Sequence, residues 1–221
     1  MITKITIKNF KGLEEASISL GDAVIFVGPN NSGKSSALQA IALWEIGMRK
    51  WAENRLKSKA KQRVGVLIHR TDILSISLPA INQLWYQLHV RESVKISDKK
   101  YRPENILIEI MAEGITNEEK WQLGFEFYYA NLDALYCRRI TTEKRGEEFP
   151  KQALEEGVGF LPPMSGLASE EDLLSRGSIH TRIGQGRTAE VLRNLCWIIW
   201  EENKEQWGEL AKKWSAYLEF N

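Results

Sequence analysis

The clearest chemistry in the sequence lies in ten residues near the amino terminus, Val27–Ser36, which read VGPNNSGKSS. Residues 28–35 match the pattern G-x-x-x-x-G-K-[ST] at every fixed position. Glycines in such a loop permit backbone angles that turn successive N–H groups inward, where they bind a phosphate at the positive end of the following helix. The lysine of the pattern reaches the β- and γ-phosphates of a nucleotide, and the hydroxyl that follows it binds Mg²⁺. We therefore predict a Walker A loop formed by Gly28, Asn30, Asn31, Ser32, Gly33, Lys34, Ser35 and Ser36.

The segments on either side of this loop have the patterns that a phosphate site requires. Residues 23–27, AVIFV, form an unbroken apolar run, which is typical of a strand covered on both faces. After the loop, Leu38, Ile41, Ala42 and Met48 recur at helical spacing and predict an amphipathic helix. Strand, loop and helix thus follow one another in the expected order.

The rest of the chain alternates between strand-like and helix-like patterns. Residues 52–70 are basic and weakly patterned, and we interpret them as the helix fraying into a surface segment. A short apolar run at 158–161 ends at two prolines, and the chain is helical from Thr188 onward, with Asn203 and Gly208 as points where two helices could divide. Period-2 alternation and turn residues predict strands at 2–8 and 16–20 and an antiparallel meander at 105–112, 120–129 and 134–140.

Composition limits the classes of partner. Among the 221 residues, 30 lysines and arginines nearly balance 29 aspartates and glutamates, so the net charge of +1 gives no general attraction to nucleic acid or to an anionic membrane. DNA binding would need a local patch. No apolar run approaches the roughly 18 to 20 residues of a membrane helix. The absence of a secretory leader and the distance between Cys137 and Cys196 favour a soluble cytoplasmic protein with both cysteines buried.

The opening of the chain, ITKITIKNFKGLEEASISLGDAVIFVGPNNSGKSSALQAI, resembles the amino-terminal lobe of ATP-binding-cassette heads in the SMC, RecF and OLD-nuclease group. The resemblance covers residues 1–49. It implies an ATPase that binds ATP and Mg²⁺, with Asn9, Phe10 and Lys11 near the base and phosphates. The alternative for Lys11 is an exposed lysine in a plain turn. Later segments, FLPPMSGL and IGQGRTAEVLRNLCWII, are similar to bacterial AAA-family or SMC-like ATPases, several of them in phage-defence systems.

The resemblance implies an α/β P-loop NTPase fold, like an ATP-binding-cassette head, with an antiparallel β-subdomain and a helical carboxy-terminal segment. We expect one partial head over residues 1–221. Its expected parts are the start of the β-subdomain with the loop and its helix (1–50), a surface or helical insertion (51–104), the β-meander (105–167) and the helical segment (168–221).

Three motifs of these heads are not found in the sequence. The heads hydrolyse ATP with a glutamate that follows the aspartate of an apolar segment, and a Ser-Gly signature from a partner head contacts the γ-phosphate. The pair Glu201 and Glu202 follows CWIIW, but the run is helical in pattern. Gln152 and Gln185 stand on either side of the expected Q-loop position. The hypothesis is therefore a Mg-ATP-binding module that needs a second, carboxy-terminal lobe, or a head-to-head homodimer, for hydrolysis.

Other patterns leave alternatives open. Residues 184–187, GQGR, could form a second anion site or a flexible entry loop, and MSGL at 164–167 favours a turn. We interpret the tryptophans at 197, 200, 207 and 214 as core, although they could also dock a partner or stack on nucleic acid. The three histidines have no metal-ligand spacing.

Two rival functions remain at this point. The first is a compact kinase or GTPase, against which stand the absent base-recognition motifs and the antiparallel meander. The second is a nonenzymatic interaction module that nucleotide stabilises and that binds a protein partner or DNA.

Overall fold

The computed structural model describes residues 1–56, 65–76, 78–97, 100–141, 149–160 and 170–218. The chain divides into two compact units, Met1–Phe160 and Leu161–Asn221, and each is described by itself. The segment MSGL lies outside the described residues.

An antiparallel sheet of six strands organises the first unit, in the order β2-β1-β6-β7-β8-β3. All five neighbouring pairs run antiparallel. The predicted meander is confirmed, as are the two amino-terminal strands. The strands are β1 (Ile2–Phe10), β2 (Leu13–Ser19), β3 (Val66–His69), β6 (Ile108–Thr116), β7 (Glu119–Asn131) and β8 (Ala134–Ile140).

Strand β3 corrects the interpretation of residues 52–70 as a frayed surface segment. Its four residues pair antiparallel with β8, from Val66 opposite Cys137 to His69 opposite Ala134. Val66 and Ile68 are buried, whereas the two residues that alternate with them are exposed. Four residues are too few to give a clear period, so pairing with a strand far along the chain decides this element.

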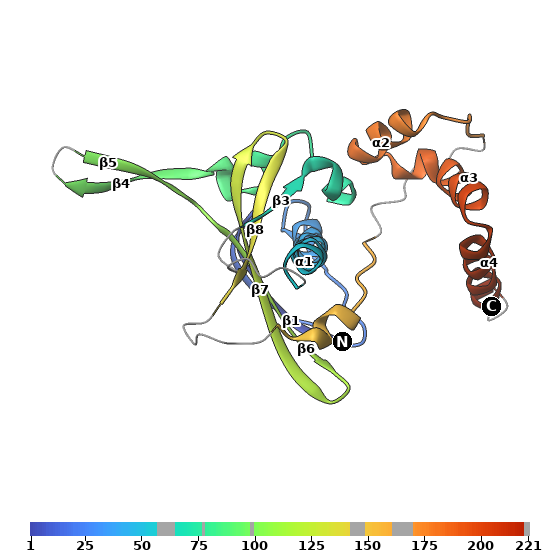
Figure 1. Cartoon of the computed structure of the whole chain (residues 1–221), viewed down its shortest axis with the longest axis horizontal. Helices are drawn as coiled ribbons and strands as arrows, with labels where there is room; N and C mark the ends of the chain where they lie inside the picture. Colours follow the sequence, from blue (N-terminus) through green and yellow to red (C-terminus); the bar gives the residue numbers. More distant parts are fainter. Residues whose placement is uncertain (57–64, 77, 98–99, 142–148, 161–169, 219–221) are drawn as a thin grey trace. The chain divides into compact units, whose positions relative to one another are not determined.

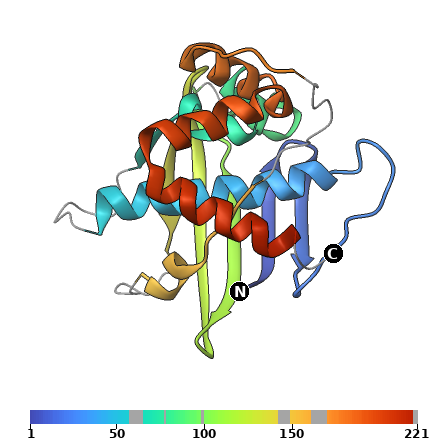
Figure 2. The same cartoon turned by 90° about the vertical axis from the view of Figure 1, so that its right-hand side faces the viewer.

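The helix α1 (Lys34–Arg55) lies across one face of the sheet, as Figures 1 and 2 show. Two of its tryptophans anchor it. The Trp44 ring stacks on Trp121 of β7 at 6.0 Å between centroids, and its Nε1–H donates to the Leu123 carbonyl at 2.8 Å. Trp51 packs against Phe125 and stacks on Phe149 at 5.2 Å. These large buried aromatic surfaces hold α1, and with it the loop at its start, on the sheet, although of the two tryptophans only Trp44 has a partner for its indole N–H among the described residues.

The apolar run at residues 23–27 is not a strand, and the prediction of a strand buried on both faces is wrong for this structure. Ile25 and Val27 are 86% and 88% exposed, while Phe26 alone packs partly against the core. A strand can be buried on both faces only inside a sheet with neighbours on either side. No described strand pairs with this segment, which forms a loop between β2 and α1 (Figure 2).

Residues between α1 and the meander form more structure than the expected surface or helical insertion. After β3 come three short 3₁₀ helices, Arg70–Ile76, Ile81–Leu84 and Tyr86–Leu88. A separate two-stranded ribbon follows, made of β4 (Arg91–Ser97) and β5 (Lys100–Asn105), and it projects away from the sheet (Figure 1).

Helices make up the described part of the second unit. They are α2 (Arg176–Gly184), a 3₁₀ helix (Thr188–Val191), α3 (Leu192–Glu202) and α4 (Lys204–Leu218). The predicted division at Asn203 is confirmed, and Gly208 lies inside α4. The apolar run at 158–161 forms no strand in its described residues, 158–160.

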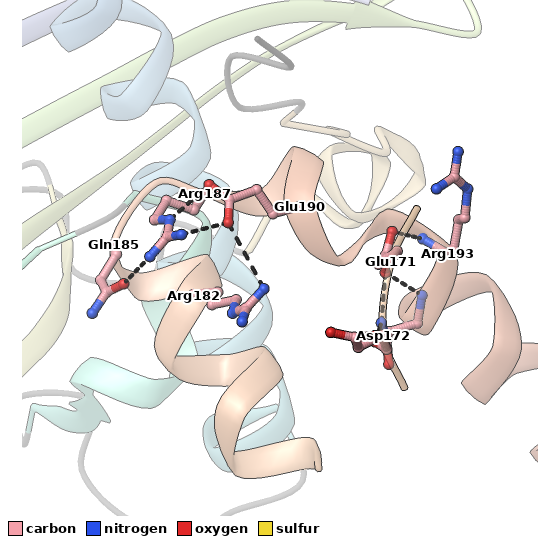
Figure 3. Close-up of polar contacts among 8 residues, drawn as sticks. Glu171, Asp172, Arg182, Gln185, Arg187, Glu190 and Arg193 are labelled. Atoms are coloured by element: carbon pink, nitrogen blue, oxygen red, sulfur yellow. Dashed lines mark hydrogen bonds and ion pairs between the residues drawn. The ribbon is translucent and has the colours of Figure 1, made fainter. Parts of the chain in front are cut away.

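The carboxylate of Glu171 caps the amino-terminal end of α3 (Figure 3). The Glu171 carboxylate accepts hydrogen bonds from the backbone N–H groups of Arg193 and Asn194, at 3.0 and 2.7 Å, and from the Asn194 side chain at 2.6 Å. Burial alone raises the pKa of Glu171, but these donors lower it below its ordinary value. Negative charge at a helix N-terminus is stabilising, so Glu171 ties the segment before α2 to α3.

Candidate phosphate-binding site

The two glycines of the Walker A pattern lie close to neighbouring side chains, which a Cβ would displace. Gly33 has φ of +87° directly before α1, and a Cβ there would lie 2.7 Å from Cδ2 of Leu13. A Cβ on Gly28 would lie 2.9 Å from Oγ of Ser32. The loop therefore turns tightly onto the helix, as a phosphate cradle requires.

The first turn of α1 offers unpaired backbone donors. Its first intrahelical bond runs from the Ala37 N–H to the Gly33 carbonyl at 2.9 Å. Among the described residues, the N–H groups of Lys34, Ser35 and Ser36 have no acceptor, and no side chain caps the helix. The first turn also contains no acidic residue. Free N–H groups at the positive end of a 22-residue helix bind an anion.

The Lys34 ammonium lies over the same loop. Its Nζ donates to the carbonyls of Gly28 and Pro29 at 2.8 and 2.6 Å and to Oγ of Ser32 at 3.3 Å. Ser35 is exposed at the start of the helix. A cation, free N–H groups and a hydroxyl thus come together within a few residues, and these groups fit a nucleotide's phosphates with a divalent cation.

The side chains of Asn9 and Phe10 have structural roles at the end of β1. Asn9, at φ of 56°, donates from Nδ2 to the Leu107 carbonyl at 2.9 Å. Phe10 is fully buried in the core, and its backbone forms an isolated antiparallel β-bridge with Trp85. The Phe10 side chain is therefore closed to a ligand, and the Nδ2 group of Asn9 is already engaged.

Lys11 is half-buried beside α1, so the alternative of an exposed lysine in a plain turn is wrong. Its Nζ donates to Oε1 of Gln39 at 2.6 Å, and Gln39 in turn donates to the Ile76 carbonyl at 3.3 Å. Burial lowers the pKa of Lys11 to about 8. The turn that carries Lys11 adjoins the loop, because Leu13 contacts Gly33. Sequence reasoning missed Gln39, which belongs to no motif.

The other acidic and amide candidates take structural positions. Glu201 and Glu202 are exposed on α3, in agreement with the helical interpretation, and Glu202 pairs with Arg176. Gln152 lies in a 3₁₀ helix, Lys151–Glu155, and donates to Glu119. Gln185 caps the end of α2.

Of the two alternatives for residues 184–187, the second anion site is wrong. The Gly186 N–H donates to the Ile183 carbonyl and the Arg187 N–H to the Arg182 carbonyl, both at 2.9 Å, with Gly186 at φ of 76°. These bonds form a Schellman cap that ends α2, so the N–H groups are occupied. Arg187 forms a two-pronged ion pair with Glu190, at 2.7 and 2.6 Å (Figure 3).

Two tryptophans of α3 are not core residues, contrary to our interpretation. Trp197 and Trp200 are 44% and 40% exposed, with ring centroids 4.8 Å apart. The side chain of Trp214 lies outside the described residues. The exposed rings line a groove of about 450 Å³ together with Leu192, Arg193, Cys196 and Trp207.

Both cysteines are free, but only Cys137 is buried, whereas Cys196 is half-buried. Within the described residues, no cluster of three histidine, cysteine, aspartate or glutamate side chains could hold a metal. No helix in that part of the chain combines the length and apolarity needed to cross a membrane.

Comparison with known proteins agrees with the loop's geometry. Residues 1–149 match the family model of the AAA ATPase domain. The chain belongs to this family. The expectation of an AAA-family ATPase region at the amino terminus is therefore confirmed, and the AAA ATPase domain implies an ATPase-type module that binds nucleotide.

Two proteins of Methanocaldococcus jannaschii are similar to this AAA ATPase domain protein. Uncharacterized protein MJECL44 is 49% identical over 41 residues, which are 18% of this chain and 12% of that protein. Uncharacterized protein MJECL10 is 26% identical over 178 aligned residues, covering 65% of this chain and 81% of that protein. The chain thus matches only a small part of MJECL44 and most of MJECL10.

Proposed function

We propose that this chain is the Mg-ATP-binding module of an ATPase in the SMC, RecF and OLD-like group. One observation carries the proposal: the Lys34 ammonium and the free N–H groups of the first turn of α1 converge on the glycine loop. Family membership over residues 1–149 supports nucleotide as the anion.

The residues of the site have distinct roles in this proposal. The N–H groups of Lys34, Ser35 and Ser36 bind phosphate oxygens, and the Lys34 ammonium leaves the loop carbonyls to neutralise the β- and γ-phosphates. The Ser35 hydroxyl would hold Mg²⁺, which supplies charge neutralisation when bound. Lys11 adds a second cation near the start of α1.

Hydrolysis requires a second lobe in this proposal. The exposed side chains of Ile25 and Val27 support this, because an apolar segment directly before a phosphate loop has the composition of a buried strand but no neighbour among the described strands. The lobe would come from further residues of a longer protein or from the other subunit of a head-to-head homodimer. ATP binding would then drive head association or a conformational change, in DNA maintenance or phage defence.

The test measures Mg-ATP binding by calorimetry and phosphate release on the same sample, for wild type and Lys34→Ala. Lys8→Ala, which removes an exposed lysine from β1, is the matched control. We expect wild type and the control to bind without turnover and Lys34→Ala not to bind. Failure of wild type to bind Mg-ATP would overturn the proposed function. Turnover by a monomeric sample that Lys34→Ala abolishes would overturn the need for a second lobe.

A nonenzymatic interaction module is the second candidate, and the exposed rings of Trp197 and Trp200 favour it. In that case nucleotide stabilises the fold and the α3–α4 surface binds a partner. Partner binding that persists in Lys34→Ala and is lost in Trp197→Ala would support this candidate.

A further inference from the structure

The two faces of the β4–β5 ribbon differ in charge. Directly opposite residues of an antiparallel pair lie on the same face, and faces alternate along each strand. Among the described residues of the ribbon, one face carries both acids, since Glu92 lies opposite Glu104 and Val94 opposite Arg102. The described residues of the other face include no acid. This basic face consists of Arg91, Ser93, Lys95, Tyr101, Pro103 and Asn105.

The basic face is presented to solvent. All six of its residues are exposed, and the Tyr101 ring is 62% exposed. An isolated two-stranded hairpin is marginally stable in water, and this ribbon has no apolar face to pack on the sheet from which it projects (Figure 1). Packing in the described structure therefore does not account for the exposed aromatic ring of Tyr101 opposite Lys95.

The base of the ribbon is ordered by its own contacts. Arg91 donates from Nε to Oδ1 of Asn105 at 3.1 Å, and its guanidinium lies 5.8 Å from the centroid of the Tyr129 ring in β7. These contacts hold one cation of the basic face at a defined place on the sheet.

We propose that the basic face binds nucleic acid, with Arg91 and Lys95 on phosphates and Tyr101 against an unpaired base. Phosphate contacts supply most of the affinity of such binding, and exposed aromatic rings stack on bases without sequence preference. Four residues of strand place the two cations about 13 Å apart, far enough to reach separate phosphates. With a net charge of +1, the chain has no general attraction to nucleic acid, so any binding of nucleic acid requires a local surface of this kind. This inference goes beyond the nucleotide site and does not depend on it.

The test is fluorescence anisotropy of a labelled single-stranded oligonucleotide and of the matching duplex, over a series of salt concentrations, with the full chain. The first variant is Lys95→Gln with Tyr101→Ala, which changes one opposite pair on the basic face. The matched control is Val94→Ala with Arg102→Gln, the neighbouring pair on the other face, which also removes one positive charge. Equal thermal unfolding midpoints verify that both variants fold.

We expect the variant of the basic face to bind the single strand at least about tenfold more weakly, and the slope of log affinity against log salt to fall by roughly 0.7. The control should stay within about twofold. Tyr101→Ala alone should weaken binding of the single strand more than binding of the duplex, because only unpaired bases stack on the ring.

Three results would overturn the proposal: no salt-dependent binding of wild type to either oligonucleotide, equal losses in the variant and the control, or Tyr101→Ala without effect on the single strand. Lys34→Ala should bind the oligonucleotide as wild type does. Failure of the nucleotide-site proposal would therefore leave this result unchanged.

Discussion

Two lysines near the start of α1 differ in environment. Lys34 is bonded to loop carbonyls, from which a phosphate can withdraw it, and its motif was evident in the sequence. Lys11 is half-buried against Gln39, and no carboxylate pairs with it among the described residues. Burial without a countercharge disfavours the charged form, so Lys11 costs stability that a bound anion would recover.

The unfolding free energy of a Lys11→Met variant should therefore depend on pH differently from that of wild type. The pKa of Lys11 is about 8 in the folded protein, against 10.5 ordinarily. Below pH 8 the variant should be more stable, on the order of 1 kcal/mol after allowance for solvent screening. Between pH 8 and 10.5 the unfolded chain holds the proton that the folded chain has lost, so wild type gains stability with rising pH and the gap narrows.

Urea unfolding of both proteins across pH 7 to 10.5, a range that spans the two pKa values, measures this gap. Lys11→Arg is the control, because a guanidinium stays charged throughout and its cost does not change with pH. A gap between Lys11→Met and wild type that stays constant would contradict the buried, lowered-pKa lysine.

At the scale of elements, two glycines determine how α1 is placed. Gly33 permits the left-handed turn into the helix, and Gly47 permits close approach to the sheet, where a Cβ would lie 2.8 Å from Cζ of Phe127. The first controls the shape of the phosphate loop. The second controls where the helix sits.

Gly33→Ala should lose both stability and nucleotide affinity. A positive φ of 87° and contact with Leu13 should cost about 1 to 3 kcal/mol of unfolding free energy, and displacement of the N–H groups should weaken Mg-ATP binding roughly tenfold or more. Calorimetry and urea unfolding measure the two effects. Gly12→Ala, where a Cβ meets no atom within 4 Å, is the control and should change the unfolding free energy by less than about 0.5 kcal/mol. Equal behaviour of the two variants would refute the tight-turn geometry.

Gly47→Ala should destabilise the first unit even though alanine favours helix. Overpacking against the rigid, buried Phe127 ring costs about 1 to 3 kcal/mol of unfolding free energy. This cost outweighs the roughly 1 kcal/mol that alanine gains in helix propensity. Gly208→Ala in α4, with no atom within 4 Å of the new Cβ, should keep the propensity gain. Differential scanning calorimetry should show a lower unfolding midpoint for Gly47→Ala and a higher one for Gly208→Ala than for wild type. A rise in both midpoints would contradict the close packing of α1.

At the scale of the whole molecule, the chain consists of two compact units, one built from the sheet with its helix and one built from helices. The first, Met1–Phe160, contains the core of tryptophans and phenylalanines and the complete glycine loop of residues 28–35, and the family match over residues 1–149 lies within it. The proposed phosphate site therefore lies within a single unit.

A fragment of residues 1–160 should fold alone and bind Mg-ATP with a Kd within about threefold of the full chain, a difference below 1 kcal/mol. Its large apolar core is the physical reason. Cooperative thermal unfolding and calorimetry test this, with the fragment carrying Lys34→Ala as the control that folds but does not bind. A fragment that unfolds without cooperativity would show that the second unit is required for the fold.

The sequence by itself determined the features that depend on short stretches of chain. The glycine and lysine spacing of residues 28–35, the alternation of β1 and the meander, the helix after the loop and the division at Asn203 are all local patterns. They follow from backbone angles, strand and helix periods and turn residues, which need no distant partner.

Only the tertiary structure decided which parts of the chain each apolar or charged segment contacts. Residues 23–27 and Val66–His69 are both short and apolar, yet the first is an exposed loop and the second is a strand, because β8 offers an edge only to the second. Trp197 has the spacing of a core residue but is exposed, and Lys11 is half-buried against Gln39. Periodicity reports which residues share a face, whereas burial depends on segments far along the chain, and this is why these positions could not be predicted.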